Sequence, residues 1–154
     1  MLPSTVDRVP DHTAEHVNAR IRRQTEERVG RVAAAGPDAI ARRLRELDEE
    51  WDVERTLEAN ASTLVAVGSG LALLVDRRFA LVPLVVGSFL LQHALQGWCP
   101  PLPVFRRYGF RTQPEIEEER YALKALRGDF EHVRDGGAGR PSARADQALR
   151  AVNG

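Results

Sequence analysis

The sequence predicts an all-α protein: a two-helix transmembrane hairpin flanked by amphipathic cytosolic helices and disordered termini. Residues 59–75 and 79–98 form runs of 17 and 20 residues without a charged side chain. At about 1.5 Å per residue, the longer run spans about 30 Å as a helix, which matches the hydrocarbon core of a bilayer. Only Asp76, Arg77 and Arg78 separate the runs. This separation is long enough for a turn and too short for another element.

Before the hairpin we expect a disordered N-terminus, residues 1–10, and an amphipathic helical region, residues 11–58. The first ten residues carry two prolines and no apolar periodicity. Gly36-Pro37 divides the helical region into two helices. The second helix could lie on the membrane surface, pair with another helix, or lead as a solvated helix into the membrane. These alternatives rest on a narrow apolar stripe formed by Ile40, Leu44, Leu47 and Trp51.

The first hydrophobic segment carries small residues on one face. Ser62, Ala66 and Gly70 recur every four residues, which places them one above another on a helix. Small side chains let helix backbones approach closely in lipid, where apolar burial gives no driving force. We therefore predict that this face packs against a helix. The pattern leaves open whether that helix is the second one of the same chain or belongs to another copy.

The second hydrophobic segment carries a polar stripe. Ser88, Gln92 and Gln96 recur every four residues, with His93 beside them. Polar side chains within hydrocarbon must face protein or water, so we expect the stripe to face inward, toward a partner helix or a small polar cavity. We favour hydrogen bonds between helices over a conduction path as its role.

The hairpin region, residues 59–110, is expected to end in an interfacial anchor. Pro100, Pro101 and Pro103 prevent the helix from continuing. Aromatic and basic side chains then gather as they do at membrane surfaces: Trp98, Phe105, Arg106, Arg107, Tyr108, Phe110 and Arg111. A C-terminal amphipathic helix, residues 111–134, should follow, with Thr112 and Glu115 as a capping box. Residues 135–154, poor in large apolar side chains, are expected to be a disordered tail.

The distribution of arginine predicts the orientation. Seven arginines flank the hairpin and two lie in its turn; the flanking ones are Arg42, Arg43, Arg45, Arg55, Arg106, Arg107 and Arg111. Basic residues favour the cytoplasmic side, so both termini should be cytoplasmic in a multi-pass membrane protein. No cleavable signal peptide is apparent, because the first 20 residues contain charges and lack an apolar run.

Composition excludes several classes of site. A single cysteine, Cys99, rules out an intramolecular disulfide framework and a cysteine-rich zinc site. Acids are interleaved with each basic cluster and the net formal charge is zero, which argues against nucleic-acid binding. His12 and His16 could share a helix face, but two ligands on an acidic helix do not make a metal site. We predict no cofactor and no metal.

The second segment ends in Gly97-Trp98-Cys99-Pro100, which precedes a proline-rich turn and a basic juxtamembrane stretch. Over about residues 55–110, this pattern resembles the YgaP-like inner-membrane transmembrane domain, a bacterial family of unknown function. The resemblance implies a two-helix module of the bacterial inner (cytoplasmic) membrane. The family pattern singles out Gly97, Cys99 and Pro100, but no chemical role is agreed for these residues. Some members carry a rhodanese sulfurtransferase domain, but this chain has no cysteine-initiated glycine-rich loop, so that activity is not implied.

Three hypotheses follow for function. The first is a non-enzymatic membrane anchor or interaction module that forms a homo-oligomer through its transmembrane helices and recruits a cytosolic protein partner. The second is a small transporter or channel subunit whose path is lined by Ser88, Gln92, His93 and Gln96. The third is a membrane factor that handles thiols or sulfur through Cys99. A helix carboxyl end disfavours the thiolate of Cys99, although Arg106 and Arg107 could offset this effect. We interpret the sequence in favour of the first hypothesis.

Overall fold

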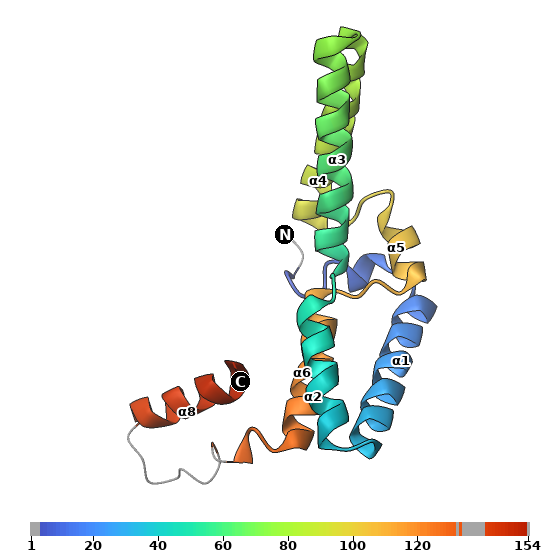
Figure 1. Ribbon diagram of the computed structural model, residues 1–154. Coiled ribbons are helices and arrows are strands. Elements are labelled where there is room, and N and C mark those ends of the chain that lie inside the picture. The colour runs from blue at the N-terminus through green and yellow to red at the C-terminus, as the bar shows by residue number, and fades with distance from the viewer. Residues whose placement is uncertain (1–3, 132, 134–140, 154) are drawn as a thin grey trace. The chain divides into compact units, whose positions relative to one another are not determined.

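A computed structural model describes residues 4–131, 133 and 141–153 of the chain. Within these residues every regular element is a helix, which confirms the all-α prediction (Figure 1). In chain order the elements are η1 (Pro10–His12), α1 (Glu15–Ala34), α2 (Pro37–Glu49), α3 (Val53–Leu74), η2 (Arg77–Ala80), α4 (Leu81–Gln96), α5 (Leu102–Tyr108), α6 (Gln113–Arg127) and α8 (Pro141–Asn153).

The chain forms two compact units. One, called here the hairpin unit, comprises Met1–Arg22 and Trp51–Pro114. The other, called the α2–α6 unit, comprises Arg23–Glu50 and Glu115–Gly154.

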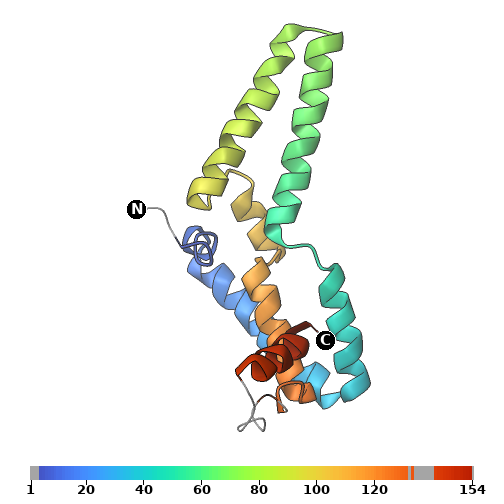
Figure 2. The same ribbon diagram turned by 90° about the vertical axis from the view of Figure 1, so that its left-hand side faces the viewer.

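The hairpin unit is built on α3 and α4, which run antiparallel and side by side (Figures 1 and 2). α3 begins at Val53, six residues before the uncharged run, because the Asp52 carboxylate accepts a hydrogen bond from the Arg55 backbone N–H at 2.6 Å. In the turn, the Asp76 carboxylate accepts from the Arg78 backbone N–H at 2.8 Å. Where the helices touch, a Cβ added to Gly68 would lie 2.9 Å from side-chain atoms of Val82 and Pro83. The close approach of α3 and α4 therefore depends on a glycine.

A small core closes the base of the hairpin. α4 ends at Gly97, whose φ of +80° is left-handed and whose N–H bonds to the His93 carbonyl at 2.7 Å. The proline-rich segment then forms α5, a short helix that the sequence did not predict, because proline is excluded from helix interiors but tolerated in the first turn. The buried core residues are Val9, Val53, Leu57, Cys99 and Leu102, with Phe105 and Phe110 packed against them.

Residues 4–10 differ from the disordered start expected for residues 1–10, whereas residues 1–3 lie outside the described residues. Residues 5–9 form turns and residues 10–12 form η1. Val9 is 1% exposed in the core, and Arg8 donates to the Ala94 carbonyl at 2.8 Å. Val9 and Arg8 thus help to hold this segment, and neither residue produces a periodic pattern in the sequence.

Arg106, expected at the membrane interface, is fully buried inside the hairpin unit. It donates to Thr13 Oγ1 at 3.2 Å, to the Phe110 carbonyl at 2.9 Å and to Asn18 Oδ1 at 3.0 Å. The side chain therefore ties the N-terminal segment and the start of α1 to α5. Its prediction as an anchor is corrected: buried acceptors from distant parts of the chain bind it instead.

In the α2–α6 unit, the apolar stripe of α2 pairs with another helix. Ile40, Leu44 and Leu47 are buried together with Ile116 and Leu123 of α6. The sequence left three alternatives open for α2, and the structure shows one of them, pairing with another helix. Trp51 lies beyond the end of α2 and is exposed, with the Arg55 guanidinium 4.3 Å above its ring.

Glu119 is the fully buried acid of the α2–α6 unit. It accepts from Arg28 at 2.9 Å and from Arg43 Nε at 2.8 Å. Burial opposes the charge of Arg43, but the hydrogen bonds that it donates to Glu119 and Glu46 outweigh this effect and raise the pKa of the guanidinium. The ion pairs thus join α1 and α2 to α6 within this unit.

The C-terminal part also differs from expectation. Within the range of the expected helix, residues 111–134, the structure has α6 over Gln113–Arg127, and Gly128 follows it with a φ of +92°. Residues 132 and 134 lie outside the described residues. Residues 141–153, predicted as part of a disordered tail, form α8, and the Val152 carbonyl accepts from Lys124 Nζ at 2.6 Å. Residues 135–140 and 154 of the predicted tail lie outside the described residues.

Candidate functional site

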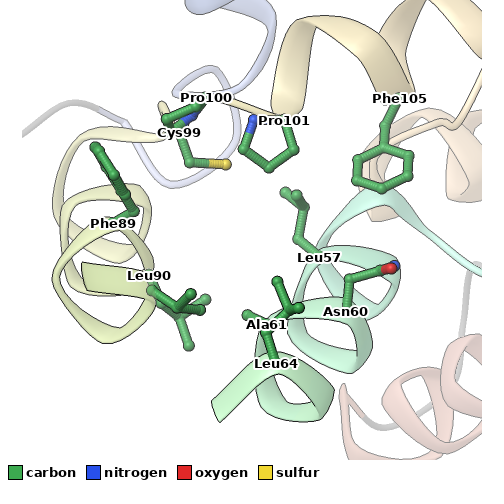
Figure 3. A pocket seen from close by; sticks show the side chains of 11 residues that line it. Leu57, Asn60, Ala61, Leu64, Phe89, Leu90, Cys99, Pro100, Pro101 and Phe105 are labelled. Atoms are coloured by element: carbon green, nitrogen blue, oxygen red, sulfur yellow. The ribbon is translucent and has the colours of Figure 1, made fainter. Parts of the chain in front are cut away.

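Cys99 lies in an apolar pocket at the base of the hairpin. The pocket has a volume of about 320 Å³, and the Sγ of Cys99 points into it (Figure 3). Its walls come from α3, α4 and the segment after α4, and comprise Leu57, Asn60, Ala61, Leu64, Val86, Phe89, Leu90, Pro100, Pro101 and Phe105. Cys99 is 4% exposed. Burial raises the pKa of its thiol, and a hydrogen bond from the Leu102 backbone only partly opposes this effect. The arrangement favours a protonated, shielded thiol over a reactive thiolate.

Gly97 and Pro100, the other residues of the motif, have structural positions. A Cβ on Gly97 would lie 2.4 Å from the Arg8 carbonyl oxygen, and the left-handed φ independently favours glycine. Pro100 is exposed at the rim of the Cys99 pocket. The Gly-x-Cys-Pro sequence therefore shapes the end of α4 and the contact with the N-terminal segment.

A second cavity, called here the His93 cavity, has a volume of about 380 Å³ and lies at the same base. It is lined by Arg8, Glu54, Glu58, Leu90, His93 and Ala94. Arg8 Nη2 forms an ion pair with Glu54 Oε1 at 2.5 Å. His93 is 5% exposed, and neither of its ring nitrogens has a hydrogen-bond partner among the described residues. The cavity thus combines two carboxylates, one guanidinium and one unpartnered imidazole.

The polar stripe of α4 does not face inward as expected. Ser88 and Gln96 are exposed and Gln92 is half-buried, whereas His93 is buried. One residue advances an α-helix by about 100°, so the buried His93 and the half-buried Gln92 point in different directions. Ser88 Oγ donates to the Leu84 carbonyl at 2.8 Å. The structure therefore separates the four residues that were grouped as one path.

The small-residue face of α3 is also outward. Ser62 and Ala66 are exposed, and a Cβ added to Gly70 would meet no atom within 4 Å. α4 instead packs at Gly68. Within this chain the face formed by Ser62, Ala66 and Gly70 is not used by α4, so it is open to another helix.

Metal ligation has no support in the part of the chain that the structure describes. No group of three or more histidine, cysteine, aspartate or glutamate side chains there lies close enough to hold a metal ion. His12, one of the two histidines considered from the sequence, instead has its Nδ1 2.9 Å from the Arg8 carbonyl oxygen.

Sequence reasoning missed Arg8, Glu54 and Glu58 as neighbours of His93. Arg8 and Glu54 are 46 residues apart, and neither belongs to a motif. One feature of the sequence could have indicated this site: two glutamates, Glu54 and Glu58, lie one helical turn apart immediately before the uncharged run.

Comparison of the chain with protein-family models, curated proteins and solved structures found no significant match.

Proposed function

We propose that the chain is an integral membrane protein in which α3 and α4 cross the bilayer and serve as an oligomerising anchor or interaction module. Two helical stretches, Pro37–Leu74 and Arg77–Gln96, contain segments long and apolar enough to cross a membrane. The first stretch includes the charge-rich α2 and a break before Val53, so its apolar part is α3. The proposal assigns no catalytic role to any residue.

The observation that carries this proposal is the exposure of the apolar side chains. In the most apolar 18-residue segment of each stretch, only 11% and 6% of the residues, respectively, are buried. A core helix of a water-soluble domain buries most of such residues, and a contiguous exposed apolar surface marks a membrane or protein contact. The exposed side chains include Leu64, Val67, Leu71, Leu73, Leu74, Leu81, Leu84, Val85, Phe89, Leu91 and Leu95.

Two outward faces support association of copies within the membrane. The small residues Ser62, Ala66 and Gly70 would allow a helix backbone to approach α3 closely. On α4, Gln92 and Gln96 make no side-chain hydrogen bond with the described residues, and amides facing hydrocarbon need a partner. A second copy supplies both a helix for the small face and hydrogen-bonding groups for the glutamines.

The arginine distribution supports cytoplasmic termini, and the resemblance to the YgaP-like domain supports the bacterial inner membrane. In this orientation the α2–α6 unit lies in the cytosol, where it would recruit a protein partner.

The oligomer is tested by Gly70→Leu in the full chain purified in mild detergent. Open space at Gly70 means that leucine should leave the fold of the single chain intact, whereas it should block close packing of the small face. Light scattering should show wild-type oligomers and variant monomers. Gly87→Leu is the matched control, because Gly87 also has no atom within 4 Å of an added Cβ but lies on α4. A Gly70→Leu protein with unchanged mass would contradict the proposal.

A transporter or channel subunit is the second candidate, and the outward polar stripe is the observation that favours it. Gln92→Leu combined with Gln96→Leu should abolish flux in reconstituted vesicles while assembly persists. If the protein instead handles thiols, Cys99→Ser should be the change that removes activity. Under the anchor hypothesis, Cys99→Ser has no effect, Gly70→Leu removes the oligomer, and the double glutamine substitution at most weakens it.

A further inference from the structure

His93 is a buried polar group without a partner. Native proteins satisfy nearly all buried polar side chains with protein groups, ordered water or a ligand. A neutral imidazole has one N–H donor and one acceptor nitrogen, and in His93 both are unmatched. Arg8 Nε is also buried without a hydrogen-bond partner and lines the same cavity. The residues around the cavity therefore leave one acceptor and two donors to be matched.

The cavity has an excess of negative charge. Glu54 and Glu58 lie one turn apart on α3, and Arg8 is the one cation among the lining residues. Arg8 contacts a single oxygen of Glu54, Oε1, and Glu58 forms no ion pair within the described residues. With His93 neutral, the lining residues carry a formal charge of −1. An occupant with a positive charge is favoured over an anion.

A metal ion is a poor fit, because no metal-ligating group of three side chains exists in the described chain. A primary ammonium group fits better. It has three N–H donors and no acceptor. Two of these donors match the acceptors on the cavity wall that have no partner, the Glu58 carboxylate and the acceptor nitrogen of His93, and the third is left to water. Leu90 and Ala94 provide an apolar wall for carbon atoms.

We propose that the His93 cavity binds a small molecule that carries a primary ammonium group and an oxygen acceptor, such as a short amino alcohol or its ester. The ammonium group donates to Glu58 and to the acceptor nitrogen of His93, the oxygen accepts from Arg8 Nε–H, and water matches the His93 N–H. A volume of about 380 Å³ lies within the range of small-molecule sites. The ligand site is separate from the anchor role of the hairpin. Binding of a soluble ligand there does not require α3 and α4 to cross a membrane. The same chemistry occurs in free ethanolamine and in a phosphoethanolamine lipid headgroup.

In the first experiment, the full-length protein in detergent is titrated with ethanolamine. Calorimetry measures the binding, and NMR of the ¹⁵N-labelled His93 ring reports on the imidazole. Choline lacks N–H donors and ethylene glycol lacks the charge, so both should bind at least about tenfold more weakly than ethanolamine. Glu58→Gln should weaken ethanolamine binding about tenfold or more, because a charged acceptor is lost. Glu58 is exposed, so this substitution should not unfold the protein. Glu118→Gln, an exposed glutamate of α6, is the matched control and should bind as wild type.

A second experiment separates the two sources. If the headgroup is the ligand, the wild type should have a higher melting temperature in phosphatidylethanolamine nanodiscs than in phosphatidylcholine nanodiscs. Glu58→Gln should then remove this difference. Binding of ethanolamine without this lipid effect identifies a soluble ligand. The proposal is overturned if choline or ethylene glycol binds as tightly as ethanolamine, if Glu58→Gln binds as tightly as wild type, or if neither ethanolamine nor the lipid produces a response. Light scattering of Gly70→Leu tests the oligomer separately.

Discussion

The carbonyl oxygen of Arg8 lies against Gly97, at a place where an added Cβ would come within 2.4 Å of it. This contact joins the N-terminal segment to the end of α4. The same residue, Arg8, reaches Glu54 and the Ala94 carbonyl with its side chain. The N-terminal segment is therefore a structural part of the hairpin base.

Gly97→Ala should destabilise the hairpin unit strongly. A left-handed φ costs a residue with a Cβ about 1 kcal/mol or more, and the backbone carbonyl of Arg8 would also have to move. We expect a loss of at least about 2 kcal/mol in the apparent free energy of unfolding in mixed micelles. Gly109→Ala is the control: it has a similar φ of +94° but no atom within 4 Å of its added Cβ. Equal losses in the two variants would show that the Arg8 contact contributes nothing.

Gly68→Ala should loosen the packing of α3 on α4. The added methyl would lie 2.9 Å from Val82 and Pro83 side-chain atoms, so the helices must shift apart. Overpacking of this kind costs about 1–3 kcal/mol. Thermal unfolding in detergent should show a lower midpoint for Gly68→Ala and no decrease for Gly70→Ala, which has open space and gains helix propensity. The reverse order would mean that the two glycines have been assigned to the wrong faces.

Cys99 should react slowly with thiol reagents near neutral pH. Burial raises the pKa of its thiol, so the reactive thiolate is a minor species there. The alkylation rate should therefore increase with pH, by about tenfold for each pH unit, up to a pKa above the ordinary value for cysteine. Iodoacetamide labelling between pH 7 and pH 10, followed by mass spectrometry, measures this rate. A plateau beginning below pH 8 would instead indicate an activated thiolate and revive the thiol hypothesis.

Glu119→Gln should destabilise the α2–α6 unit. The substitution removes the charge that faces Arg28 and Arg43 in a buried site. Breaking a buried pair by removing one partner costs about 3 kcal/mol or more. Hydrogen exchange of α2 and α6 amides should accelerate by about a hundredfold.

Asp48→Asn provides the comparison for Glu119. Asp48 also pairs with an arginine, Arg120, but its side chain is 62% exposed. Exposed pairs contribute at most about 1 kcal/mol, so exchange should change much less. Equal acceleration in both variants would contradict the importance of burial at Glu119.

The long helices of this protein follow from local sequence, whereas α5 and α8 do not. Uncharged runs predicted the positions of α3 and α4, and Asp76 to Arg78 predicted the turn between them. The apolar stripe of α2 predicted a partner without naming it. That partner, α6, could not be deduced, because the match between Ile40 and Ile116 is a tertiary contact between segments far apart in the chain.

The candidate site followed from the sequence only in part. His93 was identified by its depth in an apolar helix, but its grouping with Gln92 overlooked the rotation of about 100° between adjacent helical residues. Arg8 was assigned to a disordered segment, and Arg106 to a membrane surface. Both bind acceptors that only the folded chain brings near, so no spacing in the sequence could reveal them.

The most direct test of membrane crossing is a carbonate wash of isolated membranes, combined with labelling of single cysteines in intact bacterial spheroplasts. In a Cys99→Ser background, Arg77→Cys marks the turn and Arg150→Cys marks α8; both positions are exposed. We predict that the protein stays in the washed membrane, that the turn reacts with an impermeant maleimide, and that α8 reacts only after permeabilisation. Release of the protein by carbonate would contradict membrane crossing and would make α3 and α4 the contact surface of a soluble assembly.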